Sequence, residues 1–382
     1  MTSFADRTGL TADRPKQRYL WTDAFAVCNF LGLARSTGEG RFTDLALQLV
    51  EQVHSVLGRH RADAPRSGWL SGLDEQEGAA HPTRGGLRIG KRLPERRPEE
   101  PFDEQLEWDR DGQYFHYLTK WMHALDLVSR ATREPRFNLW ARELAQVAHE
   151  AFVYGPPRSG GRRMAWKMST DLSRPLVPSM GQHDPLDGLI TCLQLEATAA
   201  LLASTAVGPS LKPAIADFAA MLKVADIRTA DPLGLGGLLS DAHRVAQLMA
   251  EGALEGEGLL EGLLAAAQDG LRQYGRQGGL RQPAALRLAF RELGLAIGLS
   301  AVELLGKEVT EGRGRTLASA ELRARLQSME PQLALGSAIV SFWSSPAQWA
   351  DRTWLEHRDI NEVMLATSLL PEAFCQDPLL PK

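Results

Sequence analysis

The sequence predicts an all-α protein, an (α/α)6 toroid in which about six helical hairpins supply an inner and an outer ring of helices. Strand signals are scarce, and apolar residues recur at helical spacing along most of the chain. In 41–60 these residues mark one face of a helix. The pattern returns in 136–153, with Phe42 and Phe137, for example, 95 residues apart. A repeated helical hairpin is therefore the predicted structural unit.

The two helices of each hairpin differ in how their apolar residues are distributed. The first is apolar on more than one face, as expected for a helix that is covered on several sides, whereas its partner is one-sided. We expect the first helices within 21–34, 114–128, 185–203, 232–248 and 283–305, and their partners at 41–60, 136–153 and about 210–224, 257–273 and 315–328. A last pair is expected at about 331–343 and 359–370.

Long links connect the hairpins at the end where the apolar helices begin. The segments 61–113, 154–184 and 344–358 exceed ordinary loop lengths, and such loops are often functional. An open solenoid would have no reason to collect long insertions at one end. A closed toroid would use them to surround a funnel, so the loop lengths favour the toroid.

Composition and charge indicate a globular protein with a small-molecule partner. Of the 382 residues 44% are apolar, and 43 Lys and Arg stand against 47 Asp and Glu, with both signs spread along the chain. We expect a single domain over 19–375, a flexible N-terminal segment, 1–18, and a C-terminal tail, 376–382. Nucleic acid and membranes are not expected partners, and the sequence leaves homo-oligomer formation open.

Cysteine usage and the N-terminus predict a soluble, cytoplasmic protein. The three cysteines are far apart and lack metal-ligand spacing, which argues against disulfides and structural zinc. The N-terminus has no apolar core of a signal peptide, and the most apolar run, 293–306, is too short to span a bilayer. No metal and no cofactor are expected.

Hairpins with an apolar first helix and long loops at one end resemble the six-hairpin glycosidase-like superfamily over about residues 19–375. The resemblance implies the toroid and an activity on carbohydrates. The stretch Ser-Gly-Leu-Asp at 71–74 is similar to the one that carries the general-acid Asp of trehalase-like inverting glucosidases, which nominates Asp74, although Leu70 stands where that family has Glu. The superfamily often takes its base from the last hairpins, which nominates Asp359 or Glu362.

The residues just before the apolar helices are the candidate site, because helix N-termini favour anions and polar ligands. Trp108 and Tyr114 resemble flat platforms for sugar rings, Asp111 is a candidate acid, and His116 is a candidate acid, base or donor. The alternative for each acid in this position is a helix cap, which alone stabilises a helix by about 1 kcal/mol.

A second dense segment lies at 162–188. Residues around Trp166 and Lys167 alternate as in a short strand, and His183, Asp184 and Asp187 then fall at one helix start. Asp184 before Pro185 also has the pattern of an N-cap. The basic segment 83–97 is a candidate lid over an anionic substrate, or else a solvated loop.

The candidates divide into two sets. Candidate catalytic residues are Asp111, Asp184, Asp359, Glu362, Asp74, His116 and His183. Candidate substrate-binding residues are Trp21, Asp23, Trp108, Asp109, Tyr114, Trp166, Lys167, Asp187, Trp349 and Arg358.

Three functions fit these residues. The first is an inverting glycoside hydrolase that acts on a small or partly anionic saccharide with one carboxylic acid and one carboxylate. The second is a sugar isomerase or 2-epimerase, in which His116, His183 or His357 moves a proton next to a carbonyl. The third is a non-catalytic carbohydrate-binding protein, which needs the aromatic residues but no acid–base pair.

Overall fold

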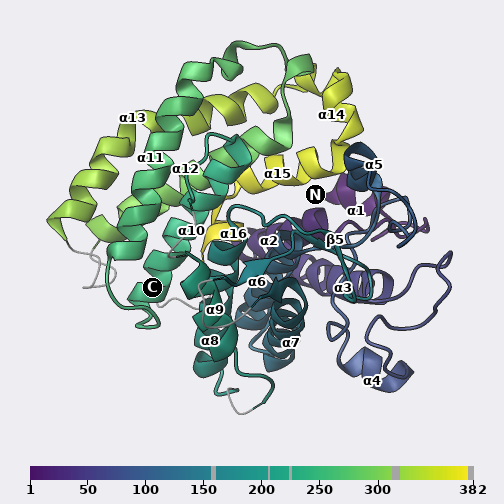
Figure 1. The fold of residues 1–382 in the computed structure, drawn as a ribbon. Coiled ribbons are helices and arrows are strands. Elements are labelled where there is room, and N and C mark those ends of the chain that lie inside the picture. Colours follow the sequence, from purple (N-terminus) through teal and green to yellow (C-terminus); the bar gives the residue numbers. More distant parts are fainter. Residues whose placement is uncertain (156–160, 205–206, 223–225, 312–318, 377–382) are drawn as a thin grey trace. The chain divides into compact units, whose positions relative to one another are not determined.

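The computed structural model describes residues 1–155, 161–204, 207–222, 226–311 and 319–376, and it confirms a mostly helical protein (Figure 1). The chain divides into two compact units, Thr2–Ala225 and Asp226–Asp377, which we call the N-terminal and the C-terminal unit. Each unit is described by itself. A single domain and a closed ring of hairpins stay predictions.

The N-terminal unit is built from helical hairpins and short strands. Its helices are α1 (Thr2–Arg7), α2 (Leu20–Thr37), α3 (Gly40–Leu57), α4 (Glu75–Ala80), α5 (Glu104–Asp109), α6 (Phe115–Thr132), α7 (Pro135–Phe152), α8 (Asp184–Leu201) and α9 (Lys212–Leu222). The pairs α2–α3, α6–α7 and α8–α9 form the expected hairpins, and α6 packs against both α2 and α8 (Figure 1).

Local sequence explains where these helices begin and end. Helix α2 is followed by Gly38, whose left-handed backbone (φ 73°) is a conformation that glycine adopts easily. Helix α7 begins at Pro135, and the N–H group that proline lacks would have no partner within the helix at this first position. In α3 the predicted apolar face is buried, including Phe42, Leu49 and Val53. Burying each such side chain contributes about 1.5–3 kcal/mol, which fixes the helix on the core.

Two small sheets lie in and near the link before α8. Strands β1 (Gln113–Tyr114), β4 (Lys167–Met168) and β5 (Pro175–Val177) form an antiparallel sheet in the order β1-β4-β5, and β2 (Val153–Tyr154) pairs with β3 (Arg163–Met164). Tyr114 stands opposite Lys167, so the start of α6 is joined to the segment around Trp166. The segment 1–18, which we expected to be flexible, contains α1, whose Phe4 is buried.

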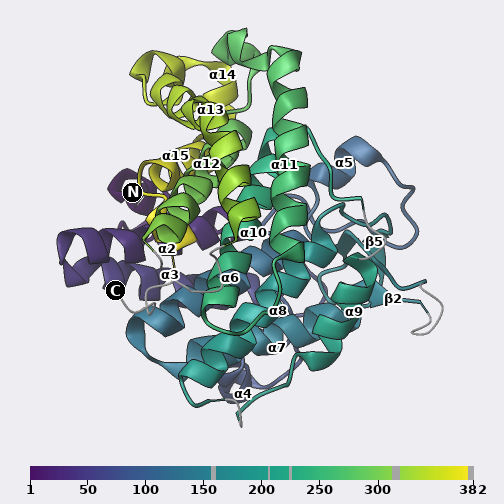
Figure 2. The same ribbon diagram turned by 90° about the vertical axis from the view of Figure 1, so that its left-hand side faces the viewer.

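The C-terminal unit consists of packed helices (Figure 2). They are α10 (Pro232–Ala250), α11 (Gly258–Gln277), α12 (Ala289–Thr310), α13 (Ala320–Trp343), α14 (Arg352–Glu356), α15 (Arg358–Leu369) and α16 (Glu372–Cys375), with the 3-10 turns η1 (Gly279–Arg281), η2 (Ala284–Leu286) and η4 (Pro346–Ala350). Helix α12 packs closely against α10 and also contacts α13 and α15.

The last predicted helix pair differs from the structure. Residues 331–343 do not start a new helix but continue α13, with Pro331 in its interior. A proline removes only one backbone donor, so the helix can pass through it at a local cost. The predicted tail, 376–382, lies outside the described residues apart from Gln376.

Two further predictions concern membrane-spanning helices and disulfides, and they are compared with the described ranges. Within them no helix combines the length and the apolar character needed to cross a membrane. Cys28, Cys192 and Cys375 are all buried and free of disulfides.

Candidate functional site

The first turns of α2, α6 and α8 bring three predicted site residues together in the N-terminal unit. The Trp21 and His116 rings lie with their centroids 6.1 Å apart, and His116 Nδ1 lies 4.0 Å from Asp184 Oδ1. Trp21 and His116 each occupy the second residue of a helix, and Asp184 the first residue of another. Helix packing, not sequence proximity, therefore assembles this site.

Aromatic rings form one wall around His116. Trp166 lies nearly parallel to the imidazole, with the centroids 5.9 Å apart and the planes at 11°, and Tyr114 packs against Trp166 at 5.1 Å. Trp108 meets Trp166 edge-on at 5.0 Å and is 49% exposed. Flat apolar faces beside a polar group are typical of sites that bind sugar rings.

Asp184 does not act as the helix cap that its position before Pro185 suggests. His183 is the N-cap residue of α8, and Asp184 is the first helical residue, with its side chain 5% exposed. Among the described residues its Oδ2 has no hydrogen-bond partner. A Cβ atom at Gly181 would lie 2.4 Å from this oxygen, so a side chain at position 181 would force the carboxyl group to shift.

Burial sets the protonation states of the two facing groups. Burial, with a smaller contribution from Asp187, raises the pKa of Asp184 from 3.8 to about 8. Burial also lowers the pKa of His116 from 6.5 to about 4, and Asp187 only partly opposes this change. At pH 7 both groups are therefore neutral, so the carboxylic acid can donate a proton and the imidazole can accept one.

The Nδ1 edge of the His116 ring is closed to a ligand. Its Nδ1 is buried on the side of Asp184, while the side chain as a whole is 25% exposed. A ligand would therefore meet the opposite edge, which carries Nε2. In this arrangement His116 contacts the ligand and Asp184 lies behind it, a geometry that orients an imidazole.

Further polar residues surround the pair. Lys120, on the same helix as His116, forms an ion pair with Asp187 at 2.9 Å. The hydroxyl oxygens of Tyr19 and Tyr117 are 2.6 Å apart, and the Tyr117 ring lies 4.9 Å from the His116 ring. His183, at the N-cap of α8, is half-buried.

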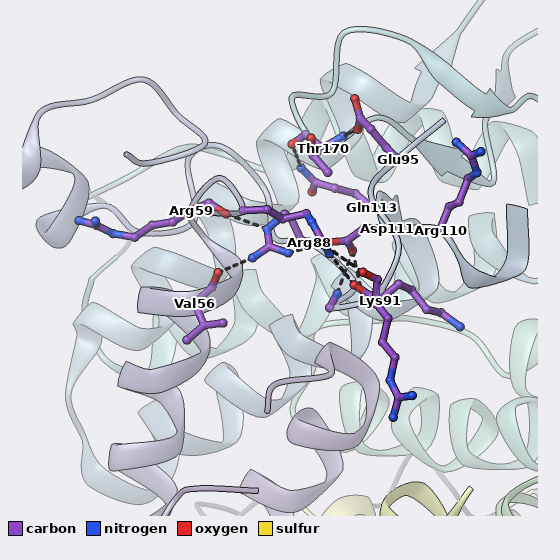
Figure 3. Close-up of polar contacts among 12 residues, drawn as sticks. Val56, Arg59, Arg88, Lys91, Glu95, Arg110, Asp111, Gln113 and Thr170 are labelled. Atoms are coloured by element: carbon purple, nitrogen blue, oxygen red, sulfur yellow. Dashed lines mark hydrogen bonds and ion pairs between the residues drawn. The ribbon is translucent and has the colours of Figure 1, made fainter. Parts of the chain in front are cut away.

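Asp111 lies elsewhere, in a buried polar network (Figure 3). It is 0% exposed and accepts hydrogen bonds from Arg88 Nη1 at 2.5 Å and from the backbone N–H of Gly90 at 3.0 Å. Arg88 also donates to the carbonyl oxygens of Val56 and Arg59. The network ties the long link 61–113 to α3, which is a structural role for Asp111.

Lys167 and the basic segment 83–97 also form buried hydrogen bonds and ion pairs. The Lys167 ammonium donates to the carbonyl and the carboxylate of Glu107, at 2.7 and 2.9 Å, and to the carbonyl of Arg110 at 2.9 Å, which uses all three of its donors. In the basic segment, Arg88 is held by Asp111 and Arg96 by Glu107. These buried contacts hold the segment to the core in place of the mobile lid that we considered.

Three other candidate acids either form local hydrogen bonds or are exposed to solvent. Asp74 caps α4 by accepting from the backbone N–H of Glu77 at 2.9 Å, and it is exposed. Asp23 is buried and accepts from the backbone N–H of Tyr19 at 2.9 Å. Asp109 is the exposed last residue of α5.

The remaining candidates belong to the C-terminal unit and are described within it. Trp349 is 39% exposed and stacks on Trp354, with the centroids 5.8 Å apart and the planes at 19°. Arg358 and Glu362 form an ion pair at 2.7 Å across one turn of α15. Asp359 lies in the first turn of the same helix and is half-buried.

Sequence reasoning left out three residues that the structure places at the site: Tyr19, Tyr117 and Lys120. The sequence could have indicated Lys120 as a site residue, because a residue four positions after His116 lies on the same face of the helix. Tyr117 follows His116 in the chain and is half-buried beside it. Tyr19 is the N-cap residue of α2, so only the tertiary structure reveals its place near Tyr117.

Comparisons with known proteins returned no match to a family model, a curated protein or a solved structure. The described ranges also hold no group of three or more His, Cys, Asp or Glu side chains arranged to bind a metal ion. The function is therefore argued from the site itself.

Proposed function

We propose that the protein is a carbohydrate-active enzyme of the sugar isomerase or 2-epimerase type, with His116 as the residue that transfers the proton. The observation that carries the proposal is the contact between His116 and Asp184, at 4.0 Å, with a neutral imidazole and a neutral carboxylic acid at pH 7. The exposed Trp108 and the half-buried Trp166 supply faces for a sugar ring, and the buried Tyr114 supports Trp166.

The proposed reaction needs one base next to a sugar carbonyl. The C–H bond at the carbon beside the carbonyl breaks, its proton moves to His116, and the electron pair forms the C=C bond of an enediolate. For the isomer, the proton returns to the former carbonyl carbon while the proton of the neighbouring hydroxyl moves to the former carbonyl oxygen, so that the second carbon becomes the carbonyl. For the 2-epimer, the enediolate first turns its opposite face toward His116, and the proton then returns to the original carbon on that face. Asp184 is assigned the part of a positioning residue, since its carboxyl group lies 4.0 Å from Nδ1 of the His116 ring.

A glycoside hydrolase is the second candidate, favoured by the raised pKa of Asp184, because a general acid must be protonated near neutral pH. His116 and Asp184 cannot be the inverting pair, because that pair consists of two carboxyl groups. Asp187 would then have to act as the second carboxylate. Oδ2 of Asp184 is buried, which makes it a poor donor to a glycosidic oxygen and places this function second.

The resemblance to six-hairpin glycosidases supports a carbohydrate as the substrate, and a toroid closed around the starts of α2, α6 and α8 belongs to the same proposal. A cytoplasmic location agrees with three free, buried cysteines. The substrate and the toroid are proposed together, because both derive from the hairpin pattern.

Product analysis tests the proposal. The purified protein is incubated with a panel of aldoses, ketoses and aryl glycosides, and the products are separated by chromatography. We expect interconversion of a sugar, reduced at least about 100-fold in His116→Gln, since general base catalysis contributes roughly 10²–10⁴-fold. His60→Gln changes a half-buried histidine of the same unit that lies outside the site, and it should keep full activity.

Other results would select another function. Release of sugar from a glycoside, lost in Asp184→Asn and Asp187→Asn, would support the hydrolase and contradict the isomerase. Binding of saccharides with no turnover by the unmodified protein would support a non-catalytic binding protein.

A further inference from the structure

Lys91 lies at the edge of the aromatic cluster with no carboxylate partner. Its ammonium is 5.4 Å from the centroid of the Tyr19 ring, and within the described part of the chain no carboxylate oxygen comes within 4.0 Å of it. The side chain is half-buried. A cation in such a place loses part of its hydration without gaining a counter-charge, which favours binding of an anion.

The backbone around Lys91 is fixed by hydrogen bonds, which sets the place from which its side chain extends toward Tyr19. Its N–H donates to Asp111 Oδ1 at 3.3 Å, and its carbonyl accepts from Arg61 Nη1 at 2.7 Å (Figure 3). Two residues earlier, the carbonyl of Ile89 accepts from the N–H of Leu20 at 3.0 Å. The buried network thus anchors Lys91 to the start of α2, beside Tyr19.

The other ionisable groups of the site are either paired with an opposite charge or neutral. Lys120 and Asp187 neutralise each other at 2.9 Å, and Asp184 and His116 are neutral at pH 7 because burial shifts the pKa of each toward its uncharged form. The charge left on this part of the site is the positive charge of Lys91.

Aromatic rings link Lys91 to the proposed proton-transfer residue. Successive steps of 5.4 Å to Tyr19, 5.6 Å to Tyr117 and 4.9 Å to His116 connect the two side chains. An anionic group at Lys91 would therefore lie away from the reacting carbon, at the far end of an extended sugar or on a second ring. Stacking on the tyrosines would hold the part between them.

We propose that the substrate of this site is a sugar that carries an anionic group, a carboxylate or a phosphate, which pairs with the ammonium of Lys91. The inference rests on the proposed carbohydrate function and names its substrate class. A carboxylate and a phosphate share the chemistry that Lys91 recognises, so the experiment separates them by the choice of ligand.

Direct binding tests the inference without relying on turnover. Isothermal titration measures D-glucuronate, glucose 6-phosphate and neutral glucose against the unmodified protein, Lys91→Gln, Lys91→Arg and Lys16→Gln, which changes an exposed lysine. We expect one anionic sugar to bind roughly tenfold or more tightly than glucose, as for a charge-assisted contact. Lys91→Gln should abolish this preference, while Lys91→Arg and Lys16→Gln should keep it.

The outcomes separate this inference from the proposed function. Equal binding of neutral and anionic sugars, or an anionic preference that survives in Lys91→Gln, overturns the inference and leaves the carbohydrate function standing. Absence of binding by every sugar overturns both. Loss of turnover in His116→Gln with the anionic preference retained supports both.

Discussion

Asp184 is a carboxylic acid at the start of a helix that does not cap the helix. Its side chain is 5% exposed, faces His116, and is covered by the backbone at Gly181. The energetic cost of a buried acid is acceptable where the group has a chemical task, and groups with such perturbed pKa values concentrate at functional sites. This residue distinguishes the proposed site from the other acids at helix starts.

The raised pKa of Asp184 predicts how stability depends on pH. The folded protein keeps the Asp184 proton up to about pH 8, whereas the unfolded chain loses it near 3.8, so the stability that this group contributes is lost as the pH rises toward 8. The contribution of His116 to stability changes with pH in the opposite direction. Folding lowers its pKa from 6.5 to about 4, so its contribution is lost as the pH drops below 6.5. Within this pair, Asp184 makes the larger contribution between pH 6.5 and 8.

We therefore expect Asp184 to contribute a decrease of about 2 kcal/mol to the free energy of unfolding from pH 6.5 to 8, seen as the difference between the unmodified protein and Asp184→Asn over this range. Urea unfolding at the two pH values measures it. Asp109→Asn, which changes an exposed carboxyl group, should retain the decrease. The same slope in Asp184→Asn and the unmodified protein would show that Asp184 is ionised throughout.

Asp111 provides a second prediction at this scale. Asp111→Asn leaves the buried Arg88 guanidinium without its counter-charge, and we expect a loss of about 3–5 kcal/mol in the free energy of unfolding. Asp63→Asn breaks an ion pair with Arg61 in which the acid is 55% exposed, and it should cost less than about 1 kcal/mol. Similar losses in both variants would contradict a structural anchor at Asp111.

Sequence reasoning identified the right residue types at the helix starts but could not separate caps from site groups. Asp74, Asp111 and Asp184 all precede or begin an element, yet the first caps α4, the second pairs with Arg88, and the third faces His116. These differences depend on burial and on partners from distant segments. No local pattern encodes either property.

At the scale of the elements, close helix packing in the C-terminal unit depends on glycines. A Cβ at Gly236 of α10 would lie 2.1 Å from the carbonyl oxygen of Gly294 in α12, whereas a Cβ at Gly237 would meet nothing within 4 Å. Neighbouring residues of one helix thus face opposite environments, which permits a matched comparison.

We expect Gly236→Ala to separate α10 from α12 and to destabilise the protein by roughly 1–3 kcal/mol, as overpacking does. Gly237→Ala should instead stabilise it by about 0.5–1 kcal/mol, because alanine suits a helix better than glycine. Thermal unfolding of the two variants compares them directly. A stabilising Gly236→Ala would show that the helices do not pack as closely as described.

Periodicity predicted most helices because a buried face repeats along each of them. The expected helix at 41–60 is α3, and the one at 136–153 is α7. The continuous helix α13 was missed, since Pro331 has the pattern of a boundary although its surroundings tolerate the lost hydrogen bond. Tertiary packing decides such positions, and periodicity does not report it.

At the scale of the whole molecule, helical periodicity predicted the all-α class, and the charge pattern favoured a small-molecule ligand. Ring closure depends on contacts between hairpins far apart in sequence, which hairpin repetition alone does not specify. The N-terminal unit already contains His116, Asp184 and the aromatic wall, so the proposed proton transfer is assigned to residues within Thr2–Ala225.

Solvent-deuterium incorporation tests the central claim most directly. A sugar that the protein interconverts is incubated in D2O with the unmodified protein or with His116→Gln, and NMR follows the signal of the proton beside the carbonyl. We predict that the unmodified protein replaces this proton with deuterium and that His116→Gln does not. Conversion of the sugar with no deuterium uptake, or equal uptake with His116→Gln, would contradict proton transfer by His116.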